Sequence, residues 1–255
     1  MALDPTEPTY VEPSMRSILL SLLAIAVLLP ANASAKCAWT WLYSPHETTS
    51  PNGWLVLEGG GEARDLLRAI ATSKPALIAR GRRIPAVVQA VHDGQMNVTQ
   101  VLLKPSQPLI AGTEARLELT LDAEIRERHA YGLDRLKWTV EPAAGPARFD
   151  GKAQAAGGER QRFGCGPGAH IEVATGLNGD ARGVLAEVRR ADGKGEPVRW
   201  LFRVRKAEIS IGHGMCSGPV KLEKGARYTI RVLGAVDTEG QLVPAPGRTV
   251  RAKAP

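Results

Sequence analysis

The feature that most limits the fold of this chain is a regular succession of short, strand-like runs separated by turn residues. The runs lie at 54–58, 76–79, 84–92, 97–103, 115–121, 136–140, 169–174, 183–190, 198–205, 208–211, 220–222 and 227–233, and 249–252 is a candidate edge strand. Asp93-Gly94 and 191–195 are hairpin signals between neighbouring runs. Helical spacing stands out only at 62–72, whereas a parallel α/β fold needs repeated helical crossovers. The pattern predicts an all-β chain built from sandwiches.

The first 35 residues are typical of a secretory signal peptide. Arg16 gives a positive start, 18–29 is an apolar run, and Ala33-Ser34-Ala35 is a small-residue cleavage site. The apolar run is shorter than a membrane-spanning helix requires. We therefore expect an exported protein, in the periplasm or at the cell surface, whose mature chain has no transmembrane span.

Three further expectations concern the region around this segment. Residues 1–14 are acidic and proline-rich, which favours Met15 as the true start of translation. Lys36 directly precedes Cys37, and lipid attachment would require a small residue there, so we expect no lipid anchor. Cys37 would be free or would link two chains in a dimer, because it lies near the mature N-terminus, where chains are usually mobile.

The charged segment 122–129 (DAEIRERH) indicates a linker or a short helix, and it places a domain boundary at about residue 130. A chain of 255 residues has room for two domains, at 36–130 and 131–255. The strand-like run at 136–140, which contains Trp138, would then begin the second domain.

Two segments resemble known families. The segment 102–113 and the run after it resemble the end of a bacterial Ig-like domain, with a proline-containing loop, a Gly-Thr turn and a final strand. The segment 222–240 resembles the corresponding part of fibronectin type III-like domains. In that family Tyr228 would hold the tyrosine-corner position, where the hydroxyl bonds to nearby backbone. The resemblance implies two tandem Ig-like (fibronectin type III-like) sandwiches after the signal peptide, and it implies no particular activity, because this fold carries many functions.

Cys165 and Cys216 each lie in a glycine-rich turn beside a strand-like run, and we expect them to form a disulfide in an exported protein. Closing this loop would stabilise the fold by roughly 4 kcal/mol. His170, His213 and Met215 lie close to them in sequence and carry donor atoms that suit copper. The sequence has none of the closely spaced cysteine or histidine pairs typical of metal sites. We therefore expect no cofactor, with a periplasmic copper-binding protein as the alternative.

The run 198–205 predicts a strand with one apolar and one basic face. Alternation places Leu201 together with Arg199, Arg203 and Arg205 on the basic face. On a chain of net charge +7 this face is either a solvated surface or a contact stripe for an anionic envelope polymer or another envelope protein. We expect no specific nucleic-acid partner.

The sequence as a whole predicts a structural or binding module of the cell envelope without catalytic activity. It contains no Gly-x-Ser-x-Gly nucleophile elbow and no phosphate-binding loop. A hydrolase, with Cys216 and His213 as its nearest candidate pair, is the third hypothesis. Trp39 and Trp41 would share one strand face and could form a platform for a carbohydrate or a partner.

Overall fold

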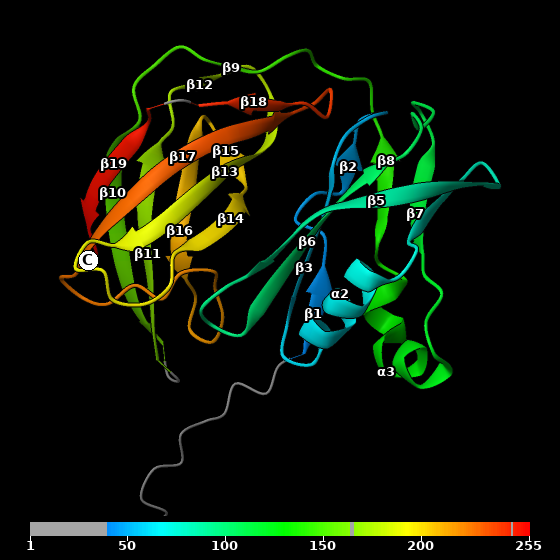
Figure 1. The fold of residues 1–255 in the computed structure, drawn as a ribbon, viewed down its shortest axis with the longest axis horizontal. Coiled ribbons are helices and arrows are strands. Elements are labelled where there is room, and N and C mark those ends of the chain that lie inside the picture. The colour runs from blue at the N-terminus through cyan, green and yellow to red at the C-terminus, as the bar shows by residue number, and fades with distance from the viewer. Residues whose placement is uncertain (1–39, 164–165, 246) are drawn as a thin grey trace, which may run out of the picture. The chain divides into compact units, whose positions relative to one another are not determined.

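The computed structural model describes residues 40–163, 166–245 and 247–255 (Figure 1). For residues 130 and 131 it describes the backbone only. The described residues all belong to one compact unit. The described part is mostly β, with the helices α2 (Ala63–Thr72) and α3 (Ala123–Leu133), which confirms the all-β prediction. The signal peptide lies outside the described residues and stays a prediction. None of the helices described is long and apolar enough to cross a membrane.

The first sheet has eight strands in the order β1-β3-β6-β5-β4-β7-β8-β2. Their bounds are β1 (Trp41–Tyr43), β2 (Thr48–Thr49), β3 (Leu55–Gly60), β4 (Ala76–Ala79), β5 (Arg82–Asp93), β6 (Val98–Pro105), β7 (Glu114–Glu118) and β8 (Lys137–Val140). All neighbours are antiparallel except β2 and β8, which are parallel. The helix predicted from the spacing at 62–72 is confirmed as α2. It buries Leu66, Leu67 and Ile70 in a first core that also contains Trp138.

The second half of the chain forms two larger sheets and a short ribbon of β9 and β12. One sheet has the order β10-β11-β16-β15, and the other has the order β14-β13-β17-β18 with β19 paired to β17. Their bounds are β9 (Arg148–Phe149), β10 (Gln154–Phe163), β11 (Gly166–Ala174), β12 (Leu177–Asn178), β13 (Ala181–Arg190), β14 (Val198–Phe202), β15 (Val204–Arg205), β16 (Glu208–His213), β17 (Arg227–Asp237), β18 (Leu242–Pro244) and β19 (Thr249–Lys253). Alternating residues of both sheets, such as Ile171, Ile211, Val184 and Ile230, meet in a second core. The arrangement is sandwich-like.

The strand predicted at 136–140 exists as β8, but its place differs from the expected one. It pairs with β7 and β2 and buries Trp138 in the first core, so it belongs to the first sheet and does not begin the second half. The charged segment before it forms α3, in which Arg128 and Glu124 pair one turn apart. The sheet that a short strand joins is decided by tertiary pairing, which the local pattern does not contain.

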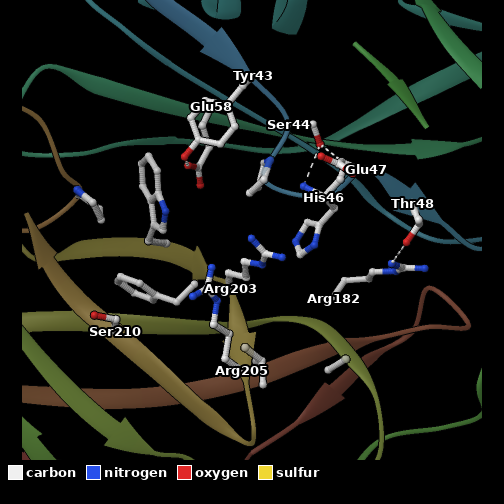
Figure 2. Close-up of a pocket in the computed structure, with 16 residues that line it drawn as sticks. Tyr43, Ser44, His46, Glu47, Thr48, Glu58, Arg182, Arg203, Arg205 and Ser210 are labelled. Atoms are coloured by element: carbon white, nitrogen blue, oxygen red, sulfur yellow. Dashed lines mark hydrogen bonds between the residues drawn. The ribbon is translucent and has the colours of Figure 1, made fainter. Parts of the chain in front are cut away.

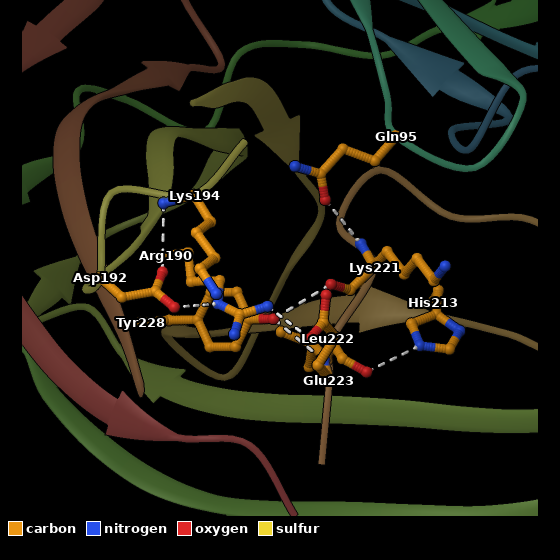
Figure 3. A network of polar contacts seen from close by, with 9 residues as sticks. All are labelled: Gln95, Arg190, Asp192, Lys194, His213, Lys221, Leu222, Glu223 and Tyr228. Atoms are coloured by element: carbon orange, nitrogen blue, oxygen red, sulfur yellow. Dashed lines mark hydrogen bonds and ion pairs between the residues drawn. The ribbon is translucent and has the colours of Figure 1, made fainter. Parts of the chain in front are cut away.

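Tyr228 shows the geometry expected of a tyrosine corner (Figure 3). Its side chain is 4% exposed, and its hydroxyl accepts a hydrogen bond from the backbone N–H of Glu223 at 2.9 Å. The same hydroxyl donates to the backbone carbonyl of Lys221 at 3.1 Å. Arg190 contributes to the same corner through an ion pair with Glu223. The hydroxyl-to-backbone bonding predicted for Tyr228 is therefore confirmed.

Gln100 joins β6 to β14. Its side chain is fully buried, its amide nitrogen donates to the backbone carbonyl of Leu201 at 3.0 Å, and its amide oxygen accepts from the backbone N–H of Leu201 at 3.0 Å. Leu201 packs beside these bonds against Val56, Leu102 and Val236. One side-chain amide thus satisfies both backbone groups of a residue in another sheet.

Candidate ligand-binding cleft

The three arginines predicted to share one strand face are separated by the structure. Arg199 lies on β14 and forms an ion pair with Glu187, with 2.9 Å between Nε and Oε2. Leu201, predicted for the same face, is buried against the first sheet. The prediction of one uninterrupted strand with a basic face is wrong, because the chain leaves one sheet after Phe202 and joins another at Val204.

The change of sheet places Arg203 and Arg205 in the lining of a cavity of about 850 Å³ (Figure 2). Arg182, at the beginning of β13, lines the same cavity and donates from Nη1 to the hydroxyl of Thr48 at 3.0 Å. Its Nε is buried and has no hydrogen-bond partner in the described part of the chain. Three guanidinium groups from separate positions in the sequence therefore converge on one concave site.

His46 lies in the same cavity, on the loop between β1 and β2, and Figure 2 shows its ring beside Arg203. Ser44 holds this loop, since its hydroxyl donates to the carbonyl of His46 at 2.8 Å and accepts from the indole N–H of Trp138 at 3.0 Å. Burial lowers the pKa of His46 to about 4, and the positive charges of Arg182 and Arg203 act in the same direction. The imidazole is therefore neutral at pH 7.

Tyr43 and Glu58 face each other across β1 and β3 and form one wall of the cavity. The Tyr43 hydroxyl donates to Glu58 Oε2 at 3.0 Å, and Gln100 donates to Oε1 at 2.8 Å. Burial raises the pKa of Glu58, although the hydrogen bonds from Gln100 and Tyr43 act in the opposite direction. Burial, followed by the charge of Glu58, raises the pKa of Tyr43, so its hydroxyl stays protonated. The pair is suited to holding the ring of Tyr43 in place.

A second cavity of about 360 Å³ adjoins the first and shares Tyr43, Glu58 and Trp200 with it. Trp41 lines this second cavity, and its ring centroid lies 5.2 Å from that of Tyr43. We refer to the two cavities together as the cleft. The sequence indicated that the rings of Trp41 and Tyr43 would lie together, because alternation places residues 41 and 43 on the same face of β1. Trp39, the other ring of the predicted platform, lies outside the described residues.

The predicted metal ligands are only partly brought together. His170 and His213 both line the second cavity, and Met215 does not. The ring nitrogens of His213 face carbonyl oxygens, with Nδ1 2.7 Å from that of Gly214 and Nε2 3.4 Å from that of Leu222. Within the described residues, no group of three or more His, Cys, Asp or Glu side chains is placed to hold a metal ion.

Cys165 and Cys37 lie outside the described residues, so the predicted disulfide and the predicted Cys37-linked dimer stay predictions. The chain segments next to the two cysteines of the disulfide nevertheless lie close together. Ala169 is opposite His213 in the pairing of β11 with β16. A Cβ built on Gly166 would lie 3.7 Å from the carbonyl oxygen of Met215. The segments that flank Cys165 and Cys216 therefore lie side by side.

No family model matches the sequence, and no curated protein matches it significantly. Among solved structures, the chain is weakly similar to pullulanase type I from Bacillus subtilis str. 168 complexed with maltose. That match has a TM-score of 0.24 and 10% identity, and it covers 81% of this chain and 26% of the pullulanase chain. Pullulanase from Anoxybacillus sp. LM18-11 complexed with maltotriose matches with a TM-score of 0.23 and 9% identity, over 80% of this chain and 24% of that chain. The chain thus spans about a quarter of either pullulanase, and TM-scores this low do not establish a shared fold.

Proposed function

We propose that this protein is an exported structural or binding module of the cell envelope, without catalytic activity, and that its cleft binds an anionic group. The convergence of Arg182, Arg203 and Arg205 on the larger cavity carries this proposal. In the part of the chain that the structure describes, none of the three forms an ion pair, whereas Arg199 outside the cavity is neutralised by Glu187. Glu141 and Asp180 act electrostatically on Arg182 without forming an ion pair with it. Guanidinium groups that have no ion-pair partner in a concave site attract and orient carboxylate, phosphate or sulfate groups.

The state of Tyr43 and Glu58 supports binding over catalysis. A nucleophilic tyrosine needs a lowered pKa or a base that removes its proton, and here the pKa of Tyr43 is raised. Glu58 already accepts hydrogen bonds from Tyr43 and Gln100, so it acts as an anchor for the wall of the cleft. The alternative function, metal binding, has less support because both ring nitrogens of His213 face backbone carbonyl oxygens.

The proposal also includes the domain architecture, export and the disulfide. We propose two tandem Ig-like domains, the second of them fibronectin type III-like, with the division after β8 instead of at about residue 130, because β8 belongs to the first sheet. The corner formed by Tyr228 supports the assignment of the second. Export rests on the features of residues 1–35, and the Cys165–Cys216 disulfide rests on the closeness of the flanking segments.

The test compares two double variants that lose the same net charge. Arg203→Ser/Arg205→Ser removes cleft arginines, and Arg82→Ser/Arg251→Ser removes two exposed arginines that lie outside the cleft and form no ion pair within the described residues. On a sulfate-bearing matrix, the cleft variant should elute at a lower salt concentration than the control variant. The two variants lose equal charge, but only the cleft variant loses a specific contact with sulfate. Equal elution of the two variants would show that retention follows net charge alone and would overturn the proposal.

A second readout uses His46 as a reporter inside the cavity. Inorganic phosphate bound by the arginines would offset the positive charges that lower the pKa of His46. The NMR titration of its ring should therefore move to higher pH when phosphate is added to the wild-type protein, and should not move in Arg203→Ser/Arg205→Ser. A titration that phosphate leaves unchanged in the wild-type protein would also overturn the proposal.

A further inference from the structure

We infer that the ligand of the cleft is an acidic saccharide, whose acid group meets the arginines of the larger cavity while a sugar ring packs on Tyr43. This inference rests on the proposed anion binding and adds the chemical class of the ligand. It follows from three features of the cleft: an exposed aromatic ring at the junction of the two cavities, hydroxyl groups in the lining, and side chains of both charges in one cavity.

The aromatic ring is that of Tyr43, which lines both cavities and is 44% exposed. Its hydroxyl is fixed by Glu58, and its ring lies against that of Trp41. A ring held in this way loses little conformational freedom when a ligand packs on it. The apolar face of a sugar ring fits such a surface, and the guanidinium groups of Arg203 and Arg205 lie in the cavity on one side of it.

The polar lining suits a ligand that carries many hydroxyl groups. Thr48 and Ser210 bring hydroxyls to the larger cavity, where that of Thr48 accepts from Arg182 and can still donate, and that of Ser210 donates to Glu172 and can still accept. Glu47 adds an exposed carboxylate. A carboxylate accepts hydrogen bonds from sugar hydroxyls, and a hydroxyl both donates and accepts. A saccharide with one acidic group per sugar can therefore use the arginines and Glu47 at the same time.

A single-stranded nucleic acid fits the same lining less well. Its binding normally relies on several exposed aromatic rings on which successive bases stack. Two further rings of the larger cavity, Trp200 and Phe202, are 3% and 4% exposed and belong to the second core. They form the floor of the cavity and offer no stacking surface.

The experiment measures the affinity of the folded protein for four probes by calorimetry: trigalacturonic acid, its carboxyl-reduced neutral counterpart, inorganic phosphate, and a short single-stranded oligonucleotide. Trigalacturonic acid should bind at least about tenfold more tightly than either phosphate or the neutral trisaccharide, a difference of about 1.4 kcal/mol. Tyr43→Ala should weaken trigalacturonic acid about tenfold and leave phosphate unchanged, whereas Tyr43→Phe, which keeps the ring, should retain most of the affinity.

The outcomes separate this inference from the proposed function. Suppose that phosphate binding depends on Arg203 and that trigalacturonic acid binds no more tightly than phosphate. This result would overturn the saccharide assignment and leave anion binding intact. The oligonucleotide binding most tightly would overturn it in favour of a nucleic acid. If the wild-type protein bound none of the anions measurably, the proposed function itself would be refuted. Circular dichroism of each variant confirms that the fold is unchanged.

Discussion

Replacing Gln100 with leucine tests how the chain's first sheet is held to β14. Gln100 is fully buried, and its amide satisfies both the N–H and the carbonyl of Leu201. Leucine is close to glutamine in size but has no polar atoms. The variant would therefore leave two buried backbone groups without partners and remove one of the donors to Glu58.

The size of the effect follows from these lost bonds. A buried backbone group that loses its partner costs about 1–3 kcal/mol, so two cost roughly 2–6 kcal/mol before any gain from burying the leucine. We expect a net loss of about 3 kcal/mol in the free energy of unfolding. For a unit of this size, a change of that magnitude lowers the melting temperature by roughly 6–12 °C.

Urea unfolding followed by circular dichroism measures this change, with Gln89→Leu as the matched control. Gln89 lies on the neighbouring strand β5, is exposed, and makes only a long contact of 3.5 Å to the carbonyl of Val87. Its replacement should change the free energy of unfolding by no more than about 0.5 kcal/mol. A Gln100→Leu variant as stable as the Gln89→Leu control would refute the reasoning, because the two bonds to Leu201 would then contribute nothing.

Three further predictions concern other parts of the chain. Tyr228→Phe should lower the free energy of unfolding by about 1–3 kcal/mol, measured by urea denaturation, because the backbone groups of Glu223 and Lys221 lose the hydroxyl that joins them; an unchanged midpoint would contradict this. Between pH 6.5 and about 4 the unfolded chain binds a proton at His46 that the folded chain does not, so stability should fall as the pH falls through this window, and this component should be absent in His46→Asn. Thiol titration of the denatured, unreduced protein should find about one free thiol per chain, and three would exclude the Cys165–Cys216 disulfide.

Local sequence signals were sufficient where a structure depends on near neighbours. The helix α2 was visible in the spacing of Leu66, Leu67 and Ile70, because one apolar face at helical period is a local property. The corner at Tyr228 was visible in the same way, because the hydroxyl bonds to backbone only a few residues upstream. Most of the strands were found from their alternation and from the turns between them.

The features that shape the cleft depend on distant partners, and the sequence does not reveal them. The run 198–205 alternates without a glycine or proline, so nothing local marks Arg203 as the point where the chain changes sheet. The partners β13 and β16 impose that change. The role of Gln100 had one usable signal, a polar residue inside the apolar strand β6, which is buried on both faces.

The contact made by Gln100 also links stability to the candidate function. Its amide nitrogen donates both to Glu58, which anchors Tyr43, and to the carbonyl of Leu201, two residues before Arg203. The ring at the junction of the cavities and the arginine at the change of sheet are therefore positioned by the same side chain. The Gln100→Leu variant, studied well below its melting temperature, should consequently bind anions more weakly than Gln89→Leu, although neither substitution touches a cleft arginine. Equal affinities would mean that other contacts hold Tyr43 and Arg203 in place and that Gln100 serves stability alone.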